Sequence, residues 1–246
     1  MSEGSNRAAI VTGGSRGIGA AVARRLARDG IAVAISYAHD AAAADAIAHE
    51  IEQAGGRAVT AKADIGERTA MTGLFDIAEK AFGGVDILVN NAAVMRLSPI
   101  AEMEDDVFEE QVARNLGGVF RGMREAARRL RNNGRIISFS STVVGLYQPT
   151  YGAYAATKAA VEALTHILAK EVAPRGITAN VVAPGPVETE LFLNGKSDAQ
   201  VRAIASANPF GRLGQPSDIA GVVAFLAGPD SGWVNGQTIR VNGGVI

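Results

Sequence analysis

The chain has 246 residues, no cysteine, 48% hydrophobic residues and a formal net charge of −1. These values exclude disulfides, a thiolate nucleophile and sulfur-ligated zinc, and they give no electrostatic reason to expect a nucleic acid or a membrane as partner. The length suits one domain over residues 1–246. Because no apolar run could span a bilayer and residues 1–10 lack the apolar core of a signal peptide, we expect a cytoplasmic protein, without a metal centre.

Short β-branched runs alternate with longer helical patterns along the whole chain. The expected strands are residues 8–12, 31–36, 58–64, 86–92, 135–141, 177–183 and 237–241. The expected helices are residues 17–29, 40–54, 67–82, a segment within 106–131, 153–172 and 216–226. Strands that are apolar on both faces and joined by helical crossovers form a parallel sheet covered on both faces. We therefore predict an α/β fold, a single-domain doubly wound parallel sheet of the Rossmann type.

Two segments of this pattern have a further meaning. Residues 184–214 are the least regular stretch and are the natural candidate for a mobile substrate loop. Within the helix expected at 153–172, the run AAVEALTHILA at residues 159–169 is too apolar all round to be covered by one sheet. A helix that is apolar on both sides is buried on both sides. We therefore expect this helix to take part in assembly.

The segment TGGSRGIG, residues 12–19, fits two motif templates. It contains G-x-S-x-G, the turn that presents a hydrolase's nucleophilic serine, here Ser15. It also places Gly13, Gly17 and Gly19 between the first strand and the first helix, close to a dinucleotide-binding fingerprint. A hydrolase needs a histidine base, and two of the chain's three histidines lie in alanine-rich helices. The start of a helix favours a pyrophosphate, so we favour the phosphate-binding turn over the hydrolase, and a glycine turn that binds nothing stays open.

A second group of reactive residues lies in SSTVVGLYQPTYGAYAATK, residues 140–158. Among its three tyrosines, only Tyr154 has a lysine four residues later, Lys158, and this spacing places both on one helix face. A neighbouring cation favours the ionised phenol and lowers its pKa, so the pair can act as an acid and a base. Ser141 ends a central strand, where sheets of this kind bind ligands, and its hydroxyl can donate to a carbonyl oxygen. Taken alone, a surface tyrosine over a solvated lysine is a commoner arrangement.

Together and in this order, these motifs resemble the short-chain dehydrogenase/reductase family over nearly the whole chain. TGGSRGIG resembles the family's cofactor loop, and NNA at residues 90–92 resembles its sheet-stabilising motif. PGPVET at residues 184–189 is similar to its segment near the nicotinamide. Ala93 stands where the family usually has a glycine, and VNGG at residues 241–244 replaces the commoner VDGG. Both departures concern local packing, because neither touches a group that moves a proton or a hydride.

The resemblance implies an oxidoreductase that transfers a hydride between a nicotinamide and a carbonyl or secondary alcohol substrate. Tyr154 would exchange the proton, Ser141 would hold the substrate oxygen, and Lys158 would lower the Tyr154 pKa while bonding the cofactor ribose. Asn115, in RNLGGVF, matches the asparagine that completes a catalytic tetrad and would anchor a water. The layout is similar to that of bacterial 3-oxoacyl-carrier-protein reductases and related ketoreductases. Family members commonly assemble as tetramers, so we expect a homotetramer, with a dimer as the alternative.

The residues after the second strand favour NADP(H) over NAD(H) as the cofactor. NAD selectivity usually needs a carboxylate at the end of that strand, and Ser36 and Tyr37 stand there instead. Asp40 lies further on and is expected to cap the next helix. Arg16 in the glycine loop offers paired donors that suit a 2′-phosphate. The resemblance and this selectivity argument together assign the following residues to the cofactor: Gly13, Ser15, Arg16, Gly17, Ile18, Gly19, Ser36, Tyr37, Asp64, Asn91, Tyr154, Lys158, Pro184, Gly185, Val187 and Thr189.

Two alternatives concern the partner and the activity. Four arginines could form a basic dock for an acidic carrier protein that bears the substrate, although a solvated charged face is commoner; they are Arg128, Arg129, Arg131 and Arg175. A protein of this fold could also bind a dinucleotide as a sensor or scaffold without turnover. The presence of Ser141, Tyr154 and Lys158 together argues against the sensor.

Overall fold

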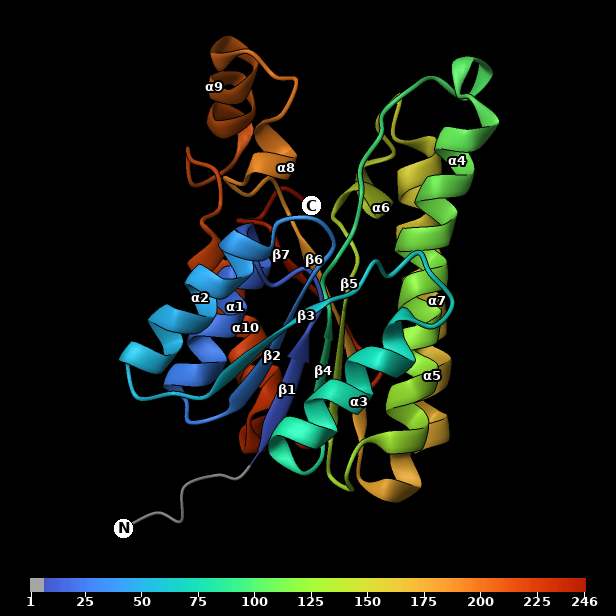
Figure 1. The fold of residues 1–246 in the computed structure, drawn as a ribbon. Helices are drawn as coiled ribbons and strands as arrows, with labels where there is room; N and C mark the ends of the chain where they lie inside the picture. The colour runs from blue at the N-terminus through green and yellow to red at the C-terminus, as the bar shows by residue number, and fades with distance from the viewer. Residues whose placement is uncertain (1–6) are drawn as a thin grey trace.

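A parallel sheet forms the centre of the computed structural model, which describes residues 7–246 (Figure 1). Residues 1–6, part of the stretch in which no signal peptide is expected, lie outside the described residues. The strands, in their order across the sheet, are β3 (Ala58–Lys62), β2 (Ala32–Tyr37), β1 (Ala8–Val11), β4 (Ile87–Asn90), β5 (Arg135–Phe139), β6 (Thr178–Pro184) and β7 (Thr238–Val241). The order reverses at β1, whose Ala9 is in register with Val33 of β2 and with Ile87 of β4. Such a reversal opens a crevice at the carboxyl ends of the strands.

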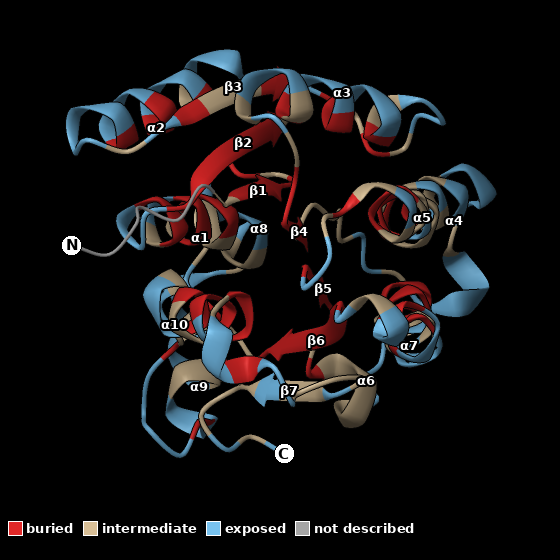
Figure 2. Ribbon diagram, turned by 90° about the horizontal axis from the view of Figure 1, so that it is seen from below, coloured by how far each residue is buried: buried red, intermediate tan, exposed pale blue. Residues whose placement is uncertain are grey.

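Helices cover both faces of the sheet (Figure 1). One face carries α1 (Gly17–Arg28), α2 (Ala41–Gln53) and α10 (Pro216–Ala227), and the other carries α3 (Ala70–Phe82), α5 (Val119–Arg129) and α7 (Gly152–Val172). Each face has its own apolar cluster, with Leu26 at the centre of one and Phe75 at the centre of the other. Figure 2 shows the central strands buried between these layers. The predicted doubly wound α/β fold is confirmed.

Shorter elements complete the chain around the carboxyl edge of the sheet and at its connections. They are the 3₁₀ turns η1 (Ile100–Glu102), η3 (Ala173–Arg175) and η4 (Pro229–Ser231), and the short helices α4 (Asp105–Gln111), α6 (Val143–Leu146), α8 (Glu190–Leu193) and α9 (Asp198–Ala207). Between α4 and α5 the helix widens into a π-helical segment, η2 (Val112–Gly118). Within residues 7–246, no helix is both long and apolar enough to cross a membrane.

Helical structure within residues 184–214 departs from the sequence-based expectation of an irregular stretch. α8 begins after Thr189, whose hydroxyl accepts from the Phe192 N–H. α9 begins after Ser197, which forms a reciprocal capping box with Gln200. The S-x-x-Q spacing marks this helix start in the sequence, but neither helix carries the long apolar pattern of a core helix.

Two helical glycines allow the packing of α5 on β4 to be tested. A Cβ at Gly122 of α5 would overlap Asn90 Oδ1, whereas a Cβ at Gly73 of α3 would meet nothing within 4 Å. We expect Gly122→Ala to lower the free energy of unfolding by about 1–3 kcal/mol because the buried contact must shift. Gly73→Ala should raise it by about 0.5–1 kcal/mol because alanine restricts the unfolded chain. Urea denaturation of both variants checks this pair, and a neutral or stabilising Gly122→Ala contradicts it.

Candidate functional site

Two adjoining cavities lie at the carboxyl ends of the strands. The first, with a volume of about 390 Å³, follows the glycine turn, and the second, of about 280 Å³, contains Ser141, Tyr154 and Lys158. The residues that line both are Ile18, Asn91, Ala93, Thr189 and Leu191. The glycine turn and the Tyr154 group, far apart in the sequence, therefore form one continuous site.

The glycine turn needs its glycines for shape. Gly13 and Gly17 have φ values of 62° and 53°, in the left-handed region where other residues are strained. A Cβ at Gly19 would overlap the Gly13 carbonyl oxygen and the Asn91 side chain. Arg16, the N-cap of α1, makes no side-chain capping bond to the first N–H groups of the helix. A narrow turn with free donors at a helix start suits a phosphate group.

The NNA motif fixes this turn to the sheet. Asn91 Nδ2 donates to the Thr12 and Gly13 carbonyl oxygens at 2.9 and 3.1 Å. The Asn91 backbone N–H donates to the Thr12 hydroxyl at 2.9 Å. Asn90 Nδ2 donates to Ser138 Oγ at 3.2 Å and so links β4 to β5. The geometry gives the motif the sheet-stabilising contacts that its resemblance implies.

An ion pair borders the far end of the first cavity. Arg114 Nη2 contacts Asp64 Oδ2 at 2.8 Å, and the Gly66 N–H donates to the same carboxyl at 2.9 Å. The hydrogen bond from Arg114 is the main cause that lowers the Asp64 pKa from its usual value. Asp64 is thus held as a carboxylate in a fixed orientation, with Tyr37 and His39 on the same cavity wall.

The residues chosen for cofactor selectivity have different surroundings. The Ser36 side chain accepts from the Gly13 N–H at 3.2 Å and is buried, so it supports the glycine turn from behind rather than lining the cavity. Asp40 caps α2 by accepting from the Ala43 N–H, as predicted. Arg16 lines the cavity and forms an ion pair with Glu190 at 2.8 Å, with both side chains 72% exposed.

The buried pair Tyr154 and Lys158 occupies the floor of the second cavity. Lys158 Nζ donates to the Phe139 carbonyl oxygen at 2.9 Å and lies 5.6 Å from the centroid of the Tyr154 ring. Burial lowers the pKa of Lys158 to about 8. Burial also raises the pKa of Tyr154 to about 12, with a smaller contribution from Tyr151, while a hydrogen bond with Ser141 acts in the opposite direction.

The pKa of Tyr154 is therefore shifted upward, in the opposite direction to the lowering that its spacing from Lys158 predicts. The i, i+4 spacing does place both side chains on one helix face, but the ammonium is directed at the Phe139 carbonyl oxygen rather than at the phenol oxygen. Loss of water around a buried phenol then determines the direction of the shift. Tyr154 is consequently protonated at neutral pH and is ready to donate.

Asn115 lies in the π-helical segment and is fully buried. Its Oδ1 accepts from the Val94 N–H and its Nδ2 donates to the Val94 carbonyl oxygen, both at 2.8 Å. A second, longer donation from Nδ2 reaches the Thr157 hydroxyl at 3.4 Å. Both hydrogens of the Asn115 amide are thus used. A water held by Asn115 would therefore have to donate a hydrogen bond to the side-chain or backbone oxygen of Asn115. π-Helical turns of this kind recur at functional sites.

The second cavity also has wall residues that the sequence analysis did not select. Helices α6, α8 and α9 and the residues before α7 contribute Leu146, Gln148, Tyr151, Phe192 and Ile204. The expected segment 184–189 lies opposite, where a Cβ at Gly17 would come within 3.3 Å of Thr189. Pro184, Gly185 and Val187 line this side. Only Tyr151 carried a readable signal, because it precedes Tyr154 by three residues and so shares its helix face.

The arginines considered as a carrier-protein dock lie at the wrong edge of the sheet. They occupy the end of α5, the turn into β5 and the segment before β6, and therefore the amino ends of these strands: Arg128, Arg129, Arg131 and Arg175. Arg129 bonds the Asp76 and Glu79 carboxylates of α3. Arg131 pairs with Asp86 at 3.3 Å. The cavities open at the opposite, carboxyl edge.

Comparisons with known proteins agree with this geometry. Residues 13–246 match the family model described as enoyl-(acyl carrier protein) reductase. The chain is 44% identical to the NADPH-dependent aldehyde reductase-like protein, chloroplastic, of Arabidopsis thaliana, over 98% of this chain and 94% of that protein. It is 36% identical to a 3-oxoacyl-acyl-carrier-protein reductase of Staphylococcus aureus, over 97% and 98%. The crystal structure of a short-chain dehydrogenase from Burkholderia cenocepacia in complex with NADP superposes with a TM-score of 0.93, 38% identity and 98% coverage of both chains.

The buried ammonium of Lys158 predicts a measurable pH dependence of stability. Its pKa falls from 10.5 to about 8 on folding. At neutral pH the folded state must hold a cation that it disfavours, so Lys158→Met should raise the free energy of unfolding by about 1–3 kcal/mol at pH 7. Between pH 8 and 10.5 the unfolded wild-type chain binds the extra proton, so wild-type stability rises with pH and the advantage of the variant shrinks.

Urea denaturation of the wild type and of Lys158→Met from pH 7 to pH 10 measures how the difference in their free energies of unfolding narrows. The control is Lys170→Met, which removes an exposed lysine from the same helix and should leave the difference from wild type near zero at each pH. A Lys158→Met protein that is less stable than wild type across the whole range contradicts the prediction.

Proposed function

Because the chain belongs to the short-chain dehydrogenase/reductase family, we propose that it is an NADP(H)-dependent oxidoreductase that interconverts a carbonyl compound and the corresponding alcohol. The observation that carries the proposal is the junction of the two cavities. There a turn shaped for phosphate adjoins a buried phenol, a serine hydroxyl and a buried ammonium. A sensor that only binds a dinucleotide would not need the second set of groups.

The residues of the first cavity suit a dinucleotide. The glycines with positive φ and the start of α1 would hold the pyrophosphate, and the fixed Asp64 carboxylate would meet the adenine end. Arg16, Tyr37 and His39 would bind a 2′-phosphate. Asn91 and the segment from Pro184 to Thr189 adjoin the Tyr154 group and would hold the nicotinamide end. When bound there, the nicotinamide supplies or accepts the hydride.

The side chains of the second cavity manage the proton. In reduction, Ser141 would donate a hydrogen bond to the substrate carbonyl oxygen. Tyr154, protonated at neutral pH, would transfer its proton to that oxygen as the carbonyl carbon receives the hydride, so the product is a neutral alcohol. The resulting phenolate would be stabilised by Ser141 and by the nearby Lys158 ammonium. Its reprotonation from water through Lys158 would restore the starting state.

Near neutral pH the phenol of Tyr154 holds its proton, which is the form that reduction of a carbonyl requires. The relatives support a carbonyl reductase, and the one named an aldehyde reductase is more similar to this chain than the 3-oxoacyl-acyl-carrier-protein reductase, at 44% against 36% identity. The positions of the four arginines at the amino edge give no support to a carrier-protein dock beside the cavity.

We also propose that the chain assembles as a homotetramer in the cytoplasm. Exposed apolar side chains on the outer helix layer support assembly, namely Phe108 of α4, Phe120 of α5 and Ile167 of α7. Static light scattering at micromolar concentration reports the mass, and a monomer would refute the assembly.

Removal of the Tyr154 hydroxyl tests the proposed chemistry. Tyr154→Phe should lower kcat for NADPH-dependent carbonyl reduction by about 10²–10⁴-fold, the usual contribution of a general acid. Affinity for NADPH, measured by fluorescence titration, should stay near the wild-type value because the ring is kept. Tyr147→Phe removes a hydroxyl from a side chain that is 83% exposed and serves as the matched control. Wild-type turnover in Tyr154→Phe would refute the acid assignment.

Arg16 and Glu190 test the choice of cofactor. Arg16→Ala should weaken NADPH binding by about 10- to 100-fold, because it removes a charged hydrogen-bond donor, and should change NADH binding little. Glu190→Gln should strengthen NADPH binding by a few-fold at most, because it removes a competing exposed ion pair. Fluorescence titrations of both variants with NADPH and with NADH measure these changes in affinity. A wild-type protein with higher kcat/KM for NADH would show that Arg16 does not set the preference.

A further inference from the structure

The wall of the second cavity carries no charge beyond its catalytic end. Among the described residues that line it, Lys158 is the one with an ionisable cationic or anionic side chain at neutral pH. Lys158 as a whole is 2% exposed, and its ammonium already donates to the Phe139 carbonyl oxygen. Leu146, Phe192 and Ile204 give the outer wall an apolar surface.

Several polar side chains of this wall are committed to the protein itself. Ser140 donates to Glu162 Oε1 at 2.6 Å, away from the cavity floor. The Thr142 hydroxyl donates to the Ala183 carbonyl oxygen and accepts from Asn242, both at 3.3 Å. The Thr189 hydroxyl caps α8. Apart from these, from Asn91 and from the catalytic group, the neutral polar side chains that line the cavity are Gln148 and Tyr151.

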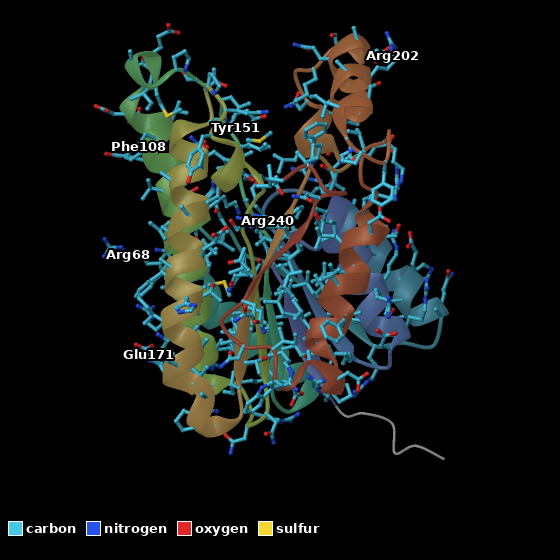
Figure 3. The ribbon with its side chains drawn as sticks, turned by 180° about the vertical axis from the view of Figure 1, so that it is seen from behind. Arg68, Phe108, Tyr151, Glu171, Arg202 and Arg240 are labelled. Atoms are coloured by element: carbon cyan, nitrogen blue, oxygen red, sulfur yellow. The ribbon has the colours of Figure 1, made fainter. Side chains whose placement is uncertain are left out.

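Charged groups near this region have other positions and partners. Lys196 donates to the Phe192 carbonyl oxygen at 2.6 Å. Arg202 projects outward from α9, whereas Tyr151 lies at the cavity end of α7 (Figure 3). Arg240 comes near Gly145 of α6 without lining the cavity. A carboxylate or phosphate inside the cavity would therefore lose its water without gaining a counter-ion, which is costly.

We propose that the substrate is an uncharged aldehyde or ketone with an apolar body, and that Gln148 at the mouth and Tyr151 beside Tyr154 determine its specificity. This inference rests on the proposed function. The cavity volume of about 280 Å³ exceeds the roughly 150 Å³ that accommodates benzene in an apolar protein cavity, so a substituted aromatic ring fits beside the reactive groups. Gln148 lines the cavity and is exposed to solvent, so an added charge at this position stays hydrated and is well tolerated.

Methyl 4-formylbenzoate and 4-formylbenzoate form the matched substrate pair, since they share the reacting aldehyde and differ in the charge at the opposite end of the ring. With NADPH, we expect kcat/KM for the ester to exceed that for the carboxylate by about 100-fold or more, mostly through KM. Isothermal titration calorimetry of the two corresponding benzyl alcohols on the protein saturated with NADPH gives the same comparison without turnover, because an alcohol and NADPH are both already reduced.

Two substitutions at one position test the cause of this preference. Gln148→Arg should raise kcat/KM for the carboxylate by about tenfold or more, because it supplies the missing counter-ion, and should change the value for the ester little. Gln148→Met, of similar length and uncharged, should leave the carboxylate disfavoured. Tyr151→Phe should lower kcat/KM for the ester and for the carboxylate by a similar factor, because the hydroxyl that it removes is neutral.

The outcomes separate this inference from the proposed function. Reduction of ester and carboxylate with similar kcat/KM overturns the inference and leaves the oxidoreductase in place. A preference for the ester that Gln148→Arg does not narrow, in a variant with wild-type thermal stability, overturns the counter-ion argument. Absence of NADPH oxidation with either aldehyde overturns the proposed function, and the calorimetric comparison then decides whether the cavity still prefers the uncharged ligand.

Discussion

The side-chain amide of Asn91 holds together the two halves of this site. Its two donors bond successive carbonyl oxygens of the turn after β1, and its own backbone is bonded to Thr12 at the end of that strand. The same side chain lines both cavities, so the phosphate-shaped turn and the proton-handling group are placed relative to each other through one residue. Gly19 must lack a Cβ for this contact to form. The reaction geometry thus depends on a backbone-satisfying contact as much as on the reactive side chains.

Burial of Tyr154 and Lys158 sets the chemical character of the floor. A phenol and an ammonium removed from water both favour their neutral forms, which explains the opposite directions of their pKa shifts. The protein therefore holds a proton ready on the phenol, and next to it a cation that burial disfavours. Such a strained electrostatic arrangement is typical of sites in which function and stability oppose each other.

Much of the fold was predictable because its strands are continuous β-branched runs and its helices have capping residues. The glycine spacing and the Tyr154–Lys158 spacing correctly indicated which residues would meet. The direction of the Lys158 ammonium was not predictable, since spacing along a helix does not say which acceptor a long side chain reaches. The position of Ser36 behind the glycine turn was not predictable for a related reason, because strand position does not reveal which side of the turn a hydroxyl faces.

Other features of the structure do have a signal in the sequence. Ser197 and Gln200 mark the start of α9. Arg131 and Arg175 directly precede strands and therefore belong to the amino edge of a parallel sheet. The π-helical segment at Val112–Gly118 has no comparable signal, because an inserted residue in a helix is accommodated by neighbours that contact it only in three dimensions.

Helices α8 and α9 form part of the wall of the second cavity but contain no buried residue. The folding free energy of the domain comes mainly from the two apolar clusters against the sheet, to which these helices do not belong. The apolar core and the outer wall of the second cavity are thus formed by different parts of the chain. Substitutions within residues 190–207 should therefore cost little folding free energy while they reshape the second cavity, so this segment can change what the cavity admits without disturbing the core.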